Sequence, residues 1–143
     1  MEGQFNVSEN LLSLNGYSKN MDGCNFYRLF ENCKSLININ YLWFPDSLSK
    51  NCYKEMFSGC SSLTTPPLLP AIELAPSCYS YMFKECVSLI TPPLLSAMTL
   101  ANNCYEGMFS GCSSLTTPPL LPAIELAPSC YKKMFASIFD END

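Results

Sequence analysis

Apolar and polar positions recur along this chain with a period of 26 residues. An aromatic residue, a methionine and a phenylalanine follow each first cysteine of the repeat at constant offsets. The 24-residue segment Met56–Tyr79 returns without change at Met108–Tyr131. Self-similarity at such a period is typical of repeat proteins, so the fold prediction starts from the repeat unit. The two cysteine columns are Cys52, Cys78, Cys104 and Cys130, and Cys60, Cys86 and Cys112.

One part of each unit has helical spacing. Cys78, Tyr79, Met82, Phe83 and Cys86 stand at i, i+1, i+4, i+5 and i+8, which predicts one apolar face on about two turns of helix. So short a helix is not stable alone, and packing between units must hold it.

Polar residues and glycines support helix ends at these places. A serine or asparagine precedes each predicted helix at the N-cap position, and Gly59 and Gly111 lie where a helix would stop. Glu106 completes a capping box with Asn103. The N-cap residues are Asn51, Ser77, Asn103 and Ser129.

The other part of each unit predicts extended backbone. In Leu63–Pro70 two consecutive prolines forbid a helix and favour extended conformation. They also remove amide donors, so any strand here is short and its ladder incomplete. The first copy, Leu36–Tyr41, has no proline and is the better strand.

A 26-residue unit buries its apolar face only by stacking on neighbouring copies. About four units fit in the chain, so we expect an α/β repeat solenoid. Residues 1–25 fit no repeat column and are predicted to form an N-terminal cap. Residues 26–135 form the repeats, and residues 136–143 an acidic C-terminal tail.

Three motifs resemble the BspA-like, or Treponema-type, leucine-rich repeats. They are Met56-Phe57-x-x-Cys60-x-x-Leu63, Leu36-x-x-Ile39-x-Tyr41 and Leu63-x-x-Pro66-x-Leu68-x-Pro70. The resemblance implies a right-handed leucine-rich-repeat-like solenoid with short parallel strands on its concave side and short helices opposite. It also implies adhesion or recognition of proteins or glycans at a cell surface or outside the cell, with no shared catalytic residues. The chain departs from the family by a longer period, by prolines inside the strand and by Met-Phe in place of Ala-Phe.

Composition excludes several function classes. The net charge is −5 and the eight basic residues are scattered, so nucleic acid is not an expected partner. No apolar run approaches the roughly 18 residues of a membrane span, so membrane insertion is not expected either. The N-terminus lacks the basic region of a signal peptide. No phosphate-cradling glycine loop is present and no cofactor is expected.

The chain has nine cysteines and no histidine, and three interpretations of the thiols compete. Cys52 and Cys60, eight apart on a helix, would lie about 12 Å apart along its axis, too far to share a zinc ion or a disulfide. Disulfides between neighbouring units are geometrically allowed, although nine is an odd number. Ile138 occupies the second cysteine column in the last unit, which favours buried free thiols used for packing. Without histidine the commonest general base is absent, and we expect no enzymatic activity.

The binding prediction depends on which residues of each predicted extended segment, such as Leu63–Pro70, face outwards. If Leu63, Pro66 and Leu68 point inwards, alternate residues form a concave face rich in threonine, proline and leucine. Such an apolar face is typical of interaction sites, so the chain is predicted to be a non-enzymatic module that binds a protein or a glycan. The alternative is a structural spacer or oligomerisation element of a larger surface or phage-tail protein, with self-association as a further option. The predicted face comprises Asn38, Asn40, Leu42, Thr65, Pro67, Leu69, Thr91, Pro93, Leu95, Thr117, Pro119 and Leu121.

Overall fold

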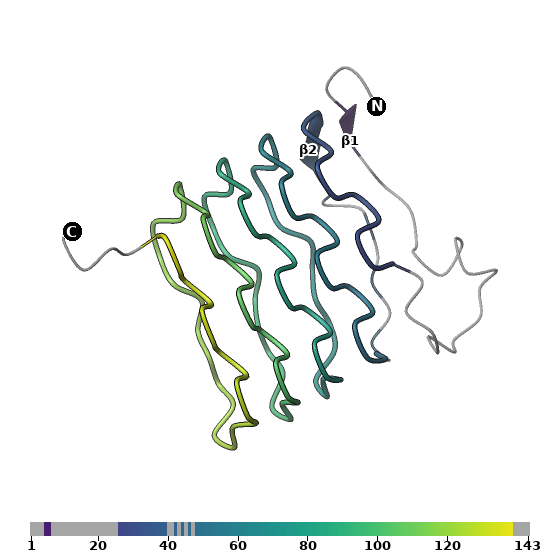
Figure 1. Ribbon diagram of the computed structural model, residues 1–143, viewed down its shortest axis with the longest axis vertical. Coiled ribbons are helices and arrows are strands. Elements are labelled where there is room, and N and C mark those ends of the chain that lie inside the picture. The colour runs from purple at the N-terminus through teal and green to yellow at the C-terminus, as the bar shows by residue number, and fades with distance from the viewer. Residues whose placement is uncertain are drawn as a thin grey trace.

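The computed structural model describes residues 5–6, 26–39, 42, 44, 46 and 48–138. The repeat copies lie side by side in chain order, with the N-terminal copy at one end of the stack and the C-terminal copy at the other (Figure 1). Each level of the stack, here called a rung, consists of a ribbon of tight turns followed by an extended segment. The ribbons are numbered 1 (26–33), 2 (51–60), 3 (77–86), 4 (103–112) and 5 (129–138), and the extended segments between the last four are 61–76, 87–102 and 113–128.

The ribbons differ from the predicted helices, because the described residues contain no helix. In ribbon 3 the backbone amides alternate between two kinds of acceptor. The amide of Met82 donates to the carbonyl of Tyr79 three residues back, at 3.1 Å, and the amide of Phe83 donates to the carbonyl of Met108 in the next rung, at 3.0 Å. Half of the amides therefore join neighbouring rungs, which the hydrogen bonds of an α-helix would not allow.

The backbone dihedral angles explain why a helix does not form. Every fourth residue of ribbon 3 has a positive φ, namely Ser77 (56°), Tyr81 (54°) and Glu85 (59°). This left-handed conformation interrupts a right-handed helix at each turn. Asn103, one of the predicted N-caps, has a φ of 58°, and its side-chain amide donates to the carboxylate of Glu106. The predicted capping pair is therefore in contact, but in a turn ribbon.

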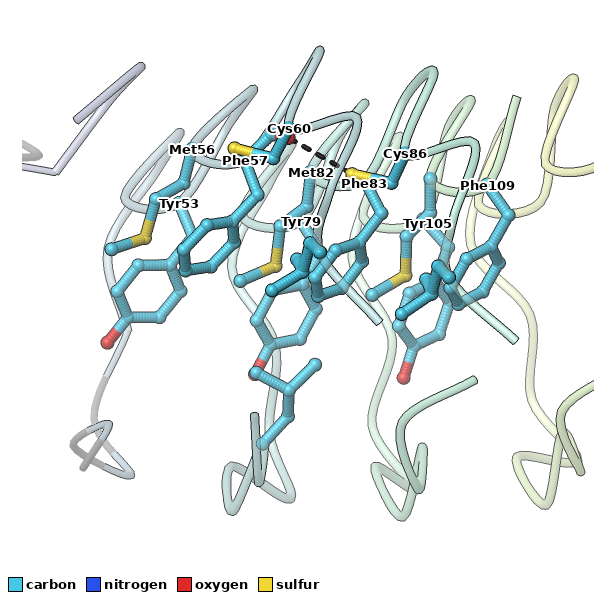
Figure 2. Close-up of a cluster of buried hydrophobic side chains, with 14 of the residues drawn as sticks. Tyr53, Met56, Phe57, Cys60, Tyr79, Met82, Phe83, Cys86, Tyr105 and Phe109 are labelled. Carbon is cyan, nitrogen blue, oxygen red and sulfur yellow. Dashed lines mark hydrogen bonds between the residues drawn. The ribbon is translucent and has the colours of Figure 1, made fainter. Parts of the chain in front are cut away.

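The inward side chains of the ribbons form two columns of stacked rings (Figure 2). Consecutive rings have centroids 5.5 to 6.1 Å apart and planes within 17° of parallel. The methionine column of the same ribbons, Met56, Met82 and Met108, is fully buried. The core is therefore a set of one-residue columns running the length of the stack. The ring columns are Phe30, Phe57, Phe83, Phe109 and Phe135, and Phe26, Tyr53, Tyr79, Tyr105 and Tyr131.

Regular strands are few among the described residues. The strand β2 (Leu36–Asn38) lies in the proline-free first copy, as predicted, and pairs in parallel with β1 (Phe5–Asn6), which falls within the predicted cap. In the later copies the ladder is sparse, and one of its bonds runs from the amide of Leu74 to the carbonyl of Thr99 at 2.9 Å. This confirms that the prolines leave the ladder incomplete.

Two further features bear on the predicted organisation. Residues 136–138 belong to ribbon 5 and not to a separate tail, and residues 139–143 lie outside the described part of the chain. Within that part, no helix has the length and apolar character needed to cross a membrane.

Candidate binding surface

The structure places most of the predicted concave face in the interior. Leu69 and Leu95 are only 3% exposed, and Thr65 is half-buried, with its hydroxyl oxygen buried and without a hydrogen-bond partner. Asn40 lies outside the described residues. The buried members are Leu42, Pro67, Leu69, Pro93, Leu95 and Pro119, the half-buried members are Asn38 and Thr65, and the exposed members are Thr91, Thr117 and Leu121.

The phase predicted for the extended segments explains this difference. The prediction placed Leu63 and Pro66 on the same inward side, although residues three apart lie on opposite sides of an extended chain. Counted in steps of two from buried Leu63, the inward side holds half-buried Thr65, buried Pro67 and buried Leu69, whereas Leu68 is exposed. Since side chains alternate with a period of two, a slip of one residue exchanges the two faces. The predicted phase was wrong for this part of the repeat.

The residues that do face outwards form what we call the outer stripe. It has two columns of large apolar side chains that are between 50% and 87% exposed. Ile72 and Met98 are direct neighbours, because the amide of Met98 donates to the carbonyl of Ile72 at 3.0 Å. Strict alternation from Leu63 would have found these residues in the sequence, because Leu68 and Ile72 both lie an odd number of residues from it. The outer stripe consists of Leu68, Leu94 and Leu120, and of Ile72, Met98 and Ile124.

An acidic hollow borders the outer stripe in the rung of Ile72. It has a volume of about 530 Å³ and opens to solvent. The exposed carboxylates of Asp46 and Glu73 belong to its wall, and Leu48, Pro70 and Leu74 complete the lining with Ile72. Apolar and negatively charged surface are thus adjacent here.

The cysteines make specific contacts in the core. Seven of the eight described cysteines are buried and Cys33 is half-buried, which confirms the burial that the packing interpretation predicted. The thiol of Cys86 donates to the carbonyl of Phe57 in the preceding rung, with Sγ and O 3.1 Å apart (Figure 2). Cys60 and Cys112 make the equivalent bond to Phe30 and Phe83. The second cysteine column therefore joins rungs by hydrogen bonds, which the packing interpretation had missed.

The thiols are held in the protonated form. Burial raises the pKa of Cys60 and of Cys112 to about 12, and that of Cys86 well above its ordinary value. A thiol needs to ionise before it acts as a nucleophile or metal ligand, so these three are chemically quiet at neutral pH. Among the residues that the structure describes, no three cysteine, aspartate or glutamate side chains lie close enough together to hold a metal ion.

Comparison with known proteins adds no relative. No protein-family model, no curated protein and no solved structure matches this chain. The resemblance to BspA-like repeats therefore remains a hypothesis that rests on the motifs of the sequence.

Proposed function

We propose that this chain is a non-enzymatic recognition module that binds a protein partner through the outer stripe. The observation that carries the proposal is a set of six large apolar side chains, from three successive rungs, each at least half exposed. Exposed apolar surface that is continuous over several elements is costly in water and is typical of interaction sites. We further propose that the stack is a repeat solenoid, and the backbone hydrogen bonds between rungs support this.

The chemistry of the stripe favours a protein over a glycan. Its side chains are leucine, isoleucine and methionine, which bury well against apolar side chains and offer few polar groups to sugar hydroxyls. The neighbouring carboxylates of Asp46 and Glu73 suit a lysine or arginine of the partner. The expected ligand is a segment with apolar residues spaced to match the rungs and a basic residue at one end.

Selection from a random peptide library displayed on phage tests this proposal. The wild-type protein is the bait, and binding of the selected peptides is then measured on two triple variants. The first replaces the stripe column, Leu68→Asp, Leu94→Asp and Leu120→Asp. The second introduces the same charge in the same rungs but at their tips, Ser61→Asp, Val87→Asp and Ser113→Asp.

We expect the selection to yield apolar peptides that carry a basic residue. Their affinity for the stripe variant should be lower than for the wild type by about tenfold or more, because three apolar contacts are lost. The tip variant should bind them as the wild type does. Thermal unfolding of both variants checks that the fold is retained. Selected peptides that bind all three proteins equally well would contradict the proposal.

A further inference from the structure

Met98 differs from the other described methionines in its exposure to solvent. Its side chain is 50% exposed, and it lies in an extended segment, on the outer stripe. The other four lie in the ribbons, where they form one column of the core, and none of them is more than 2% exposed. Within the described residues, Met98 is therefore the methionine whose thioether solvent reaches. The buried column consists of Met56, Met82, Met108 and Met134.

Met98 occupies the middle rung of the outer stripe. Its backbone amide donates to the carbonyl of Ile72 at 3.0 Å, so the two residues are neighbours in successive rungs. Ile124 holds the same repeat position in the following rung. Leu94, the other stripe residue of the middle rung, is 63% exposed. A change of polarity at Met98 would therefore fall in the centre of the apolar surface and not at its edge.

The chemistry of Met98 also differs from that of its column. The duplicated segment places isoleucine at positions 72 and 124, and the middle copy places methionine between them. Both side chains are apolar, but methionine carries a polarizable sulfur atom. Oxidation of that sulfur to the sulfoxide turns an apolar side chain into a polar one and disrupts interfaces that contain it. The stripe thus has one oxidisable atom at its centre.

We propose that Met98 is a site of reversible oxidation by peroxides, and that its sulfoxide weakens partner binding at the outer stripe. This regulation rests on the proposed function, because it acts through the same surface. The sulfur lone pair attacks one peroxide oxygen, the O–O bond breaks, and the sulfur keeps that oxygen. Hydrogen peroxide is reduced to water, with no net uptake or release of protons. A sulfoxide that is buried against an apolar partner loses its hydration, which costs binding free energy.

The core should be spared under the same conditions. The buried methionines are covered by the packed columns of the ribbons. The buried thiols react slowly, because the thiolate is the reactive form and burial raises the pKa of Cys60 and Cys112 to about 12. Half-buried Cys33 is more accessible to peroxide, so a test of Met98 needs a control that keeps every cysteine.

Peptide mapping of the folded protein after treatment with hydrogen peroxide shows which methionine reacts. Cleavage after glutamate places each described methionine in a different peptide, and Met98 lies in Cys86–Glu106. We expect this peptide to gain one oxygen atom well before the peptides of the four buried methionines. Fragmentation of the peptide should locate the oxygen on Met98 and not on Cys86 or Cys104. Equal rates for all five methionines would overturn the proposal.

A peptide from the phage selection then measures the effect on binding. The chosen peptide binds the wild type more tightly than the stripe variant, so that it reports on the outer stripe. Oxidation should lower the affinity of the wild type for it by about tenfold or more, because an apolar contact at the centre is lost. Methionine sulfoxide reductases should restore the affinity. The oxidised protein should unfold at the same temperature as the untreated one.

Met98→Ile is the matched control, since it places the isoleucine of positions 72 and 124 in the middle rung and keeps every cysteine. Whatever its own affinity for the peptide, that affinity should be the same before and after peroxide. A loss of binding that Met98→Ile shares would assign the effect to the thiols and overturn the proposal.

The remaining outcomes separate the regulation from the proposed function. A stripe-dependent peptide that binds oxidised and untreated wild type equally well would overturn the regulation alone. A selection in which no peptide distinguishes the wild type from the stripe variant would overturn the proposed function, and the regulation with it.

Discussion

Single residues hold the ribbons in a conformation that most side chains avoid. Eleven described residues other than glycine have a positive φ, each at a cost of about 1 to 2 kcal/mol relative to right-handed backbone. The hydrogen bonds to the next rung offset this cost. At position 107 the choice of residue is further restricted to glycine, because a Cβ there would lie 2.1 Å from the ring of Tyr81 in the preceding rung.

Gly107 and Tyr81 should therefore be energetically coupled. We expect Gly107→Ala to lower the free energy of unfolding by about 2 to 4 kcal/mol, from the positive φ of 60° and the overlap with the ring. In a Tyr81→Ser background the ring is absent, and the same substitution should cost only about 1 to 2 kcal/mol. Urea unfolding of the four proteins of this double-mutant cycle measures the coupling. Equal costs in both backgrounds would show that the ring does not restrict position 107.

At the scale of the ribbon, the sequence predicted which residues are inside but not the backbone that places them there. Cys78, Tyr79, Met82, Phe83 and Cys86 are all buried, as the helical pattern required. Their spacing repeats every four residues, and this is also the period of the positive φ angles. A segment of about two turns is too short to distinguish a period of 4 residues from the period of 3.6 residues of a helix. The glycine signal was right in part, since Gly59 and Gly111 have φ of 76° and 75°, although no helix ends there.

Glycine substitutions distinguish the ribbon from a helix by the sign of their effect. Glu85 occupies the column of Gly59 and Gly111 and has a positive φ, so Glu85→Gly should raise the free energy of unfolding by about 0.5 to 1 kcal/mol. In a helix the same change would lower it by about 1 kcal/mol. Ser58→Gly, at a position without positive φ, is the control and should be destabilising. Urea unfolding measures both, and a destabilised Glu85→Gly protein would contradict the ribbon geometry.

At the scale of the whole molecule, the repeat predicted the columns, but the predicted outward face was wrong by one residue. Stacking of copies follows from the periodicity, because each column position meets its own equivalent in the next rung. The outward face depends on the phase of the alternation within each extended segment, and strict counting from Leu63 gives the observed phase.

The two columns of buried thiols should set an alkaline limit to stability. Burial keeps the pKa of Cys60 and Cys112 at about 12 in the folded protein, and burial also raises that of Cys78 and Cys86 well above its ordinary value. In the unfolded chain these thiols ionise near pH 8.5, roughly. The folded state thus holds more protons than the unfolded state above that pH. Stability is complete below about pH 8 and falls as the pH rises towards 12, by up to about 1.4 kcal/mol per pH unit for each thiol.

Urea unfolding under reducing conditions, at intervals from about pH 7 to about pH 10, measures this dependence. The unfolding midpoint should stay level up to about pH 8 and then fall steeply. Cys86→Ala removes one of the titrating thiols and also its bond to Phe57, so this variant should be less stable at neutral pH and lose stability less steeply above it. A wild-type midpoint that stays level to about pH 10 would contradict this prediction. It would mean that the thiols ionise equally in the folded and unfolded states, so that burial does not raise their pKa.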